Sequence, residues 1–176
     1  MNTGMARSLT LSDKSANKLL AARDQRQDAL ARALSKGCQA TVFLALNIPG
    51  PEKMPSGAQE LFLWALEQLE KGFSDVVTFE KGSDALGHYA IMGTNTAPIE
   101  AKEHCMALET RNPSARLIDL DVYSGNGDQI DRKSLGFLGR SCLVCSEEAV
   151  ECMRLRRHLP NEVICKVHEL LARFRP

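Results

Sequence analysis

The sequence predicts an α+β fold, in which a single compact domain holds a mixed sheet with flanking helices. Two observations lead to this prediction. Segments with helical spacing of apolar residues and short β-branched segments follow one another in the mixed order α-β-α-β-β-α-β-β-α-α. The 176 residues are 44% hydrophobic, and a chain of this size and composition can bury one full core. We therefore expect residues 1–176 to form one domain, since no internal repeat divides them.

The first part of the chain is expected to supply two helices and a central strand. Residues 1–12 are small and polar and are expected to be frayed. A long helix follows and runs to about Ser35, with leucines and alanines at helical spacing. Residues 39–47 are apolar and partly β-branched, as in a central strand, and the two prolines of segment 48–53 end it. A second helix with a broad apolar stripe is expected at 56–69.

The middle of the chain is expected to supply the remaining strands and one helix. Residues 74–80 and 88–92 are typical of two strands joined as in a hairpin. Helix 98–109 has a proline near its first turn. Residues 116–123 alternate between apolar and polar side chains, and a glycine-containing turn connects them to a short segment at 129–132. These elements complete the expected sheet.

The last segment, 140–176, is rich in cysteine and is expected to be helical. Its two helices, at 147–157 and 161–173, are separated by Pro160. From residue 151 onward the chain carries six Lys or Arg against three Glu, so the tail is basic. Such a tail can meet an acidic partner protein or a polyphosphate.

Composition and charge exclude several classes of protein. Lys+Arg and Asp+Glu balance at 22 each, so no overall field favours nucleic acid or an anionic membrane surface. No apolar run approaches the roughly 18 residues of a membrane span, and the N-terminus lacks the apolar core of a signal peptide. We therefore expect a cytoplasmic protein, whose six cysteines are thiols or metal ligands rather than disulfides.

The predicted strand at 116–123 carries the most informative pattern in the sequence. Asp119 and Asp121 share one face of this strand, because successive side chains point to opposite faces. Their Cβ atoms are about 6–7 Å apart by the strand rise. Such carboxylates can bracket divalent metals such as Mg²⁺, a geometry used in phosphoryl transfer. A solvated edge strand with an acidic face is the alternative, and the pair alone does not decide between them.

Two cationic positions have a functional and an ordinary interpretation. Lys53 follows the predicted central strand in a proline-rich loop, where a long cation is well placed to meet a phosphate. A proline turn with a solvated lysine is equally compatible with the sequence. Arg23 belongs to a polar stretch of the first helix, which is rich in hydrogen-bonding groups but could also be a solvated helix face.

Cysteine spacing indicates a second site. Cys142 and Cys145 have the Cys-x-x-Cys spacing that suits tetrahedral zinc, and Cys152 with His158 could complete a structural Cys₃His site. The six-residue step from Cys152 to His158 requires the intervening helix to end or bend. A thioredoxin-like redox pair and reduced cysteines packed under the last helices are the alternatives.

These motifs together resemble one family. In order along the chain, the resemblance rests on Arg23-Asp24-x-Arg26-Gln27, Pro49-Gly50-Pro51-x-Lys53, Arg116-Leu117-x-Asp119-x-Asp121-Val122, and Arg140-x-Cys142-Leu143-x-Cys145 followed by Cys152 and His158. The chain resembles the citrate lyase holo-acyl-carrier-protein synthases, also called apo-citrate lyase phosphoribosyl-dephospho-CoA transferases. The malonate decarboxylase counterpart is a more distant likeness. The resemblance covers nearly the whole chain.

The resemblance implies a nucleotidyltransferase-like enzyme that uses 2'-(5''-triphosphoribosyl)-3'-dephospho-CoA. It would attach this group through a phosphodiester to a serine of the citrate lyase acyl carrier (γ) subunit and release pyrophosphate. Asp119 and Asp121 would hold Mg²⁺. The triphosphate would also need fixed cations. The candidates for this role are Arg23, Lys53, Arg116 and Arg140.

Three points stay open at this level. A third acidic metal ligand is expected among Glu109, Asp128 and Asp131. The family usually reads His-Pro-x-Gly-Arg before the acidic pair, whereas this chain has Asn112 and Ala115 in place of the histidine and glycine. The alternative function is a non-catalytic zinc-bearing module that binds an acidic carrier protein through its basic tail.

Overall fold

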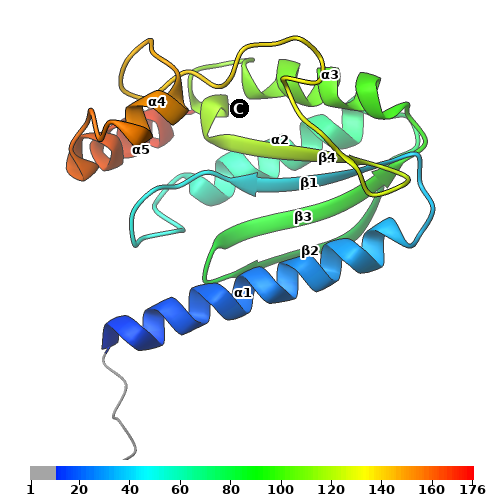
Figure 1. The fold of residues 1–176 in the computed structure, drawn as a ribbon, viewed down its shortest axis with the longest axis horizontal. Coiled ribbons are helices and arrows are strands. Elements are labelled where there is room, and N and C mark those ends of the chain that lie inside the picture. Colours follow the sequence, from blue (N-terminus) through cyan, green and yellow to red (C-terminus); the bar gives the residue numbers. More distant parts are fainter. Residues whose placement is uncertain (1–10) are drawn as a thin grey trace, which may run out of the picture.

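The computed structural model describes residues 11–176, and the elements follow the expected order with one added 3₁₀ turn, η1 (Figure 1). The helices and strands are α1 (Leu11–Leu34), β1 (Ala40–Leu46), α2 (Ala58–Gly72), β2 (Val77–Asp84), β3 (Gly87–Thr94), α3 (Pro98–Glu109), η1 (Ser114–Leu117), β4 (Ile118–Ser124), β5 (Gln129–Ile130), α4 (Ala149–Arg154) and α5 (Pro160–Arg173). None of the described helices combines the length and the apolar character needed to span a membrane.

The sheet has five strands in the order β2-β3-β1-β4-β5, and every neighbouring pair is antiparallel. The expectation of a mixed sheet was therefore wrong. Strands joined through a helix can pair in parallel, and β1 and β2, like β3 and β4, do run in the same direction. Each helical crossover, however, skips one strand, and the strand that fills the gap runs the other way. This is the connectivity of a split β-α-β motif.

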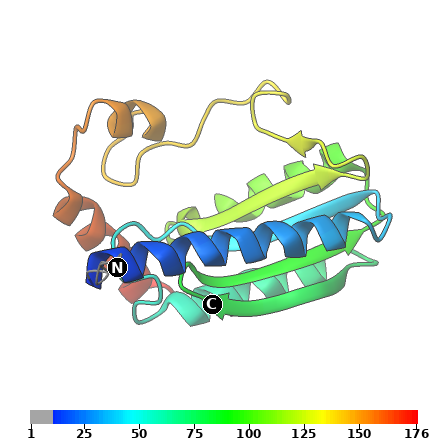
Figure 2. The same cartoon turned by 60° about the horizontal axis from the view of Figure 1, so that its bottom comes forward.

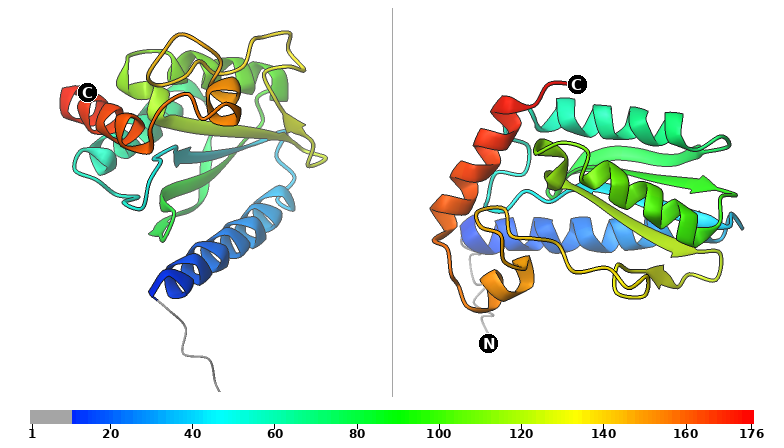
Figure 3. Two further views of the ribbon diagram at one scale, coloured as in Figure 1. Left: turned by 60° about the vertical axis from the view of Figure 1, so that its left-hand side comes forward. Right: turned by 90° about the horizontal axis from the view of Figure 1, so that it is seen from above.

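Helices cover both faces of this sheet. Helices α2 and α3 lie on one face and α1 lies on the other (Figure 2). The larger apolar core forms under α2 and α3, where Val42, Leu44, Leu120 and Val122 are buried. A smaller cluster around Ile91 lies under α1. Helices α4 and α5 lie together near one end of the sheet (Figure 3).

Several helices and strands begin or end at other residues than the sequence predicted. The expectation of fraying at 1–12 falls mostly outside the described residues, and α1 already begins at Leu11. Strands β2 and β3 extend through the predicted hairpin connection, because the turn is shorter and lies at residues 85–86. Residues 116–117 belong to the 3₁₀ turn, so β4 begins at Ile118. Helix α4 is much shorter than the predicted 147–157.

Candidate functional site

The acidic strand β4 presents the two faces that its alternating sequence predicts. Ile118, Leu120 and Val122 are buried in the core, whereas Asp119 and Asp121 are only partly buried on the opposite face. A pocket of about 260 Å³ opens at these two carboxylates. The other residues that line it are Lys102, Leu120, Gln129, Asp131, Arg132, Lys133 and Arg140.

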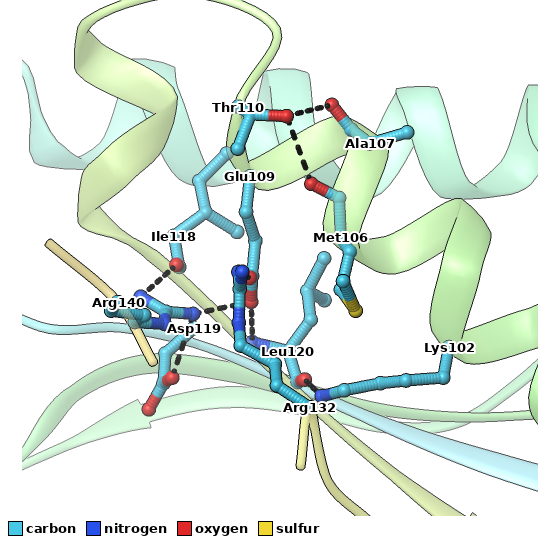
Figure 4. A network of polar contacts seen from close by, with 10 residues as sticks. All are labelled: Lys102, Met106, Ala107, Glu109, Thr110, Ile118, Asp119, Leu120, Arg132 and Arg140. Carbon is cyan, nitrogen blue, oxygen red and sulfur yellow. Dashed lines mark hydrogen bonds and ion pairs between the residues drawn. The ribbon is translucent and has the colours of Figure 1, made fainter. Parts of the chain in front are cut away.

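Side chains, rather than another strand, complete the edge of β4 beside the pocket. Strand β5 pairs with only two residues of β4, so the backbone groups nearer the start of β4 need other partners. Lys102 Nζ donates to the Leu120 carbonyl at 2.8 Å, and Glu109 Oε1 accepts from the Leu120 N–H at 2.9 Å (Figure 4). Arg140 Nη1 donates to the Ile118 carbonyl at 3.0 Å. Helix α3 and the loop after β5 are thereby fixed to the strand that carries the acids.

Glu109 is the centre of this polar network. Its side chain is only 3% exposed and forms ion pairs with both Arg132 and Arg140. A buried carboxylate needs such partners, and in return it fixes the two guanidinium groups in position. Arg140 also reaches the acidic pair, with 3.1 Å between its Nη2 and Asp119 Oδ1 (Figure 4). The pocket therefore combines two carboxylates with two arginines whose positions are fixed by Glu109.

The two carboxylates influence one another. Burial, followed by the negative charge of Asp119, raises the pKa of Asp121 above its ordinary value. Gln129 Nε2 donates to Asp121 Oδ1 at 2.9 Å and acts in the opposite direction. Two acids that repel one another in a partly buried pocket favour a bound cation between them, because a cation relieves the repulsion.

The three candidates for a third acid lie in different surroundings. Glu109 is occupied by two arginines and the β4 backbone. Asp131 lines the pocket, and its Oδ1 accepts from the Ser134 N–H at 2.7 Å. Asp128 is exposed in the turn before β5 and does not line the pocket. Within residues 11–176, no third acid joins Asp119 and Asp121 closely enough to form a three-ligand group.

The predicted phosphate-binding cations do not all lie together. Arg140 lines the acidic pocket, but Arg116 is in the 3₁₀ turn and donates to the Ser141 and Cys142 carbonyls. Lys53 Nζ donates to the Ile48 carbonyl at 2.7 Å, and burial, followed by the positive charge of Arg23, lowers the pKa of Lys53. The charge of Arg23 thus acts on Lys53, and we refer to these two residues, which do not line the pocket, as the second cationic group.

Sequence reasoning missed Lys102, Arg132 and Lys133. A signal for Lys102 was present, because Lys102 and Glu109 are seven residues apart and share the buried face of α3 with Cys105 and Met106. Two opposite charges at this spacing on an otherwise apolar helix face indicate a specific polar partner. The sequence has no comparable signal for the two residues after β5, which belong to an irregular loop.

The two departures from the family pattern fit the local backbone. Asn112 Oδ1 accepts from the Ala115 N–H at 2.9 Å and thereby closes the start of the 3₁₀ turn. Ala115 is fully buried, and its φ is not positive, so this position does not require glycine. Alanine in place of glycine at position 115 therefore causes no backbone strain before strand β4.

The four predicted cysteine and histidine ligands do come together. One ligand atom from each of Cys142, Cys145, Cys152 and His158 lies within 4.8 Å of all the others. Ligands bound at about 2.3 Å to a tetrahedral ion are about 3.8 Å apart. The Sγ atoms of Cys145 and Cys152 are 3.5 Å apart, and His158 Nε2 is 3.3 Å from Cys145 Sγ. The group can hold a metal ion.

The backbone around this cluster provides the bend that the spacing requires. Helix α4 ends at Arg154, and Arg156 has a φ of 47°, which is uncommon for a residue other than glycine. The chain thus turns between Cys152 and His158, and the histidine reaches back to the Cys-x-x-Cys turn. In that turn the Val144 N–H donates to Cys142 Sγ at 3.4 Å, an arrangement that favours a thiolate.

Paired carboxylates beside fixed guanidinium groups are typical of one class of protein, namely enzymes that bind and transfer phosphorylated groups. The comparison with protein families gives the same class. The sequence model of the apo-citrate lyase phosphoribosyl-dephospho-CoA transferases matches residues 14–174, and the chain belongs to this family. The predicted family is confirmed, and membership in a transferase family argues against the non-catalytic module.

Curated relatives carry the same description. A probable apo-citrate lyase phosphoribosyl-dephospho-CoA transferase of Streptococcus pyogenes serotype M5 (strain Manfredo) is 31% identical over 173 residues, covering 95% of this chain and 88% of the relative. A protein with the same description from serotype M18 (strain MGAS8232) is 32% identical over 136 residues, covering 74% and 71%. The apo-citrate lyase phosphoribosyl-dephospho-CoA transferase of Citrobacter koseri is 26% identical, covering 88% and 86%.

Proposed function

We propose that the protein transfers the phosphoribosyl-dephospho-CoA group of 2'-(5''-triphosphoribosyl)-3'-dephospho-CoA to a serine of the acyl carrier (γ) subunit of apo-citrate lyase. The serine oxygen forms a bond to the α-phosphorus, the bond between the α- and β-phosphates breaks, and pyrophosphate and the serine proton leave. The observation that carries this proposal is the pocket in which Asp119 and Asp121 lie beside arginines anchored by Glu109. The family match supports the substrates.

Asp119 and Asp121 are the proposed ligands of Mg²⁺, and Asp131 is the acid of the pocket lining that could join them. Oxygen ligands of this kind suit Mg²⁺, which would neutralise charge on the triphosphate. Arg132, Lys133 and Arg140 would bind the phosphate oxygens around it. Because Glu109 already holds the guanidinium groups in place, these side chains lose little conformational entropy when the substrate binds. This is nucleotidyltransferase-type chemistry.

The second cationic group has a separate proposed role. Arg23 and Lys53 lie outside the pocket lining and could bind the phosphate groups of the dephospho-CoA part. Arg116 stays in the proposed set of phosphate-binding residues. Its contacts with the Ser141 and Cys142 carbonyls also let it support the segment that carries Arg140.

The cysteine cluster is the proposed site of a structural zinc ion. A complete Cys₃His set leaves no open position for a substrate, which favours a structural over a catalytic metal. Zinc would hold together segment 140–158, whose first residue, Arg140, reaches Asp119. The free thiols of the chain suit a reducing compartment such as the cytoplasm.

The proposal is tested by incubating the protein with purified apo-acyl carrier subunit, the triphosphoribosyl precursor and Mg²⁺. Mass spectrometry should show the carrier gaining one phosphoribosyl-dephospho-CoA group, with release of one pyrophosphate. EDTA should abolish the reaction, and excess Mg²⁺ should restore it. A carrier that stays unmodified under conditions in which a C. koseri enzyme control modifies it would rule out this function.

A further inference from the structure

The four most exposed large hydrophobic side chains of the described residues all belong to the segment around the cysteine cluster. They are Leu138 at 82%, Met153 at 70%, Leu159 at 69% and Val150 at 63% exposure, and no other large hydrophobic side chain there exceeds 55%. Single exposed apolar residues are normal on a protein surface, but this concentration in 22 residues of sequence is not. We refer to these four side chains as the apolar surface.

The way this segment is held explains how such side chains can point outward. Helix α4 makes at most marginal contact with any other helix or strand in the described part of the chain. The segment folds around the sulfur and imidazole ligands of its own cluster instead. Met153 follows Cys152 directly and Leu159 follows His158, so both residues are next to cluster members in the chain. Leu143 of this segment packs against the main core, whereas the four side chains of the apolar surface remain available for a partner.

The apolar surface comes near the rim of the acidic pocket at Leu138. Leu138 is two residues before Arg140, which lines the pocket and pairs with Asp119. The Arg140 carbonyl accepts from the Ala149 N–H at 2.8 Å, so the start of α4 is fixed to the same rim. A protein that covers the apolar surface would therefore also cover one side of the pocket mouth.

The segment that carries the apolar surface also carries exposed charged side chains. Arg154, Arg156 and Arg157 are exposed in the same segment. Arg154 pairs with Glu151, and Arg157 lies 3.9 Å from Glu147, but Arg156 forms no ion pair within residues 11–176. The same segment carries Glu147, Glu148 and Glu151, two of which face these arginines, so Arg156 is the cation to which a carboxylate of a partner would be attracted. The region thus suits an acidic partner with an apolar contact patch.

We propose that the apolar surface is the docking site for the apo-acyl carrier subunit, the protein acceptor of the reaction. This inference rests on the proposed function, because an acceptor serine must reach the pocket and its protein must then cover the surface beside the pocket mouth. The carrier is predicted to present apolar side chains and carboxylates around that serine. Binding the carrier here places the serine hydroxyl at the acidic pair without using the cations that bind the triphosphate.

The test measures carrier binding separately from transfer. Calorimetry with the full-length, zinc-loaded protein gives the Kd for the purified apo-carrier subunit. The variants are Leu138→Ser, which is four residues before Cys142 and adjacent to no metal ligand in the chain, and the double variant Met153→Ser/Leu159→Ser. Each should weaken carrier binding at least about tenfold, as expected for a contact residue at an interface centre. The KM for the triphosphoribosyl precursor and the zinc content should not change.

Matched controls come from exposed apolar residues elsewhere. Leu63→Ser in α2 and Ile99→Ser in α3 remove side chains of 46% and 55% exposure and should leave the carrier Kd within about twofold. Parental carrier binding by Leu138→Ser and by the double variant would overturn the inference, as would a parent protein that does not bind the carrier. If light scattering shows a dimer that these variants dissociate, the surface joins two copies instead. Carrier binding without transfer would reject the proposed function and leave the docking site intact.

Discussion

The sheet domain and the cysteine-rich segment differ in where their apolar side chains lie. In the sheet, Leu44 and Leu120 are almost completely buried between strands and helices, and removal of apolar surface from water is the main stabilising effect. In segment 137–159, Leu138 and Met153 are largely exposed, and the side chains that come together are the three cysteines and the histidine of the cluster. The same type of residue therefore has opposite roles. Apolar residues form the core in one region and are available for binding in the other.

The largest expected effect concerns the acidic pair, which lies where the two regions meet. Asp119→Asn and Asp121→Asn keep side-chain size but remove the charge, so each should lower kcat by about 10²–10³-fold or more. Circular dichroism should show an unchanged fold. The double variant should be scarcely slower than either single one, because both residues act through one metal site. Asp128→Asn, in the exposed turn, is the control and should transfer at the parental rate. Near-parental transfer by either pocket variant at saturating Mg²⁺ would exclude the metal-centred mechanism.

The next effect separates the core from the segment by stability. Leu44→Ala removes a fully buried side chain from the central strand β1 and should lower the free energy of unfolding by about 2–5 kcal/mol. Urea denaturation followed by far-UV circular dichroism measures this change. Leu63→Ala, at a half-exposed position of α2, should change it by less than about 0.5 kcal/mol. Equal effects of the two variants would contradict the assignment of the core.

Glu109→Gln tests the link between the two regions. The variant keeps the size of the side chain but leaves Arg132 and Arg140 without their buried counter-charge. These arginines are 19% and 28% exposed and can partly turn to water, so we expect a loss of about 2 kcal/mol, less than for a fully buried pair. The KM for the precursor should rise because the guanidinium groups lose their fixed positions. A Glu109→Gln variant with parental KM would show that the carboxylate has a purely structural role.

Metal removal should have the smallest effect on the sheet. After chelation, backbone amides in 140–158 should exchange with solvent much faster, whereas amides of β1 and β4 should keep their protection. The free energy of unfolding of the sheet should change by less than about 1 kcal/mol, because α4 contributes little to the main core. Hydrogen exchange with mass spectrometry, together with zinc analysis, measures both. Cys165→Ser changes an exposed cysteine outside the cluster and should retain stoichiometric zinc. Unchanged exchange in 140–158 would argue against a structural metal.

Local patterns in the sequence predicted more of the site than of the sheet. The alternation of Ile118 to Val122 placed the two acids on one face, and cysteine spacing identified all four members of the cluster. Strand pairing could not be predicted in the same way. Whether a crossover leads to the adjacent strand or skips one depends on which strand later fills the gap, and that is settled by contacts between residues far apart in the chain.

Residues whose role comes from tertiary contacts were the hardest to foresee. Glu109 was one of three unranked candidates for a third metal ligand, but it forms ion pairs with two arginines from the loop after β5. Arg116 was placed on the strand, but the 3₁₀ turn directs it to Ser141 and Cys142. In both cases the partner lies more than 20 residues away in the chain, and the spacing of residues along one element cannot predict such a contact.

The side-chain contacts along β4 also bear on how copies of the chain behave in a crowded solution. An open sheet edge offers unpaired N–H and C=O groups onto which another strand can add, and this is a common route to aggregation. Here Lys102, Glu109 and Arg140 already occupy the backbone groups of Ile118 and Leu120. A strand from another molecule would have to displace a buried, charged network to pair at this edge. The groups that shape the acidic pocket therefore also oppose strand addition at this edge of the sheet.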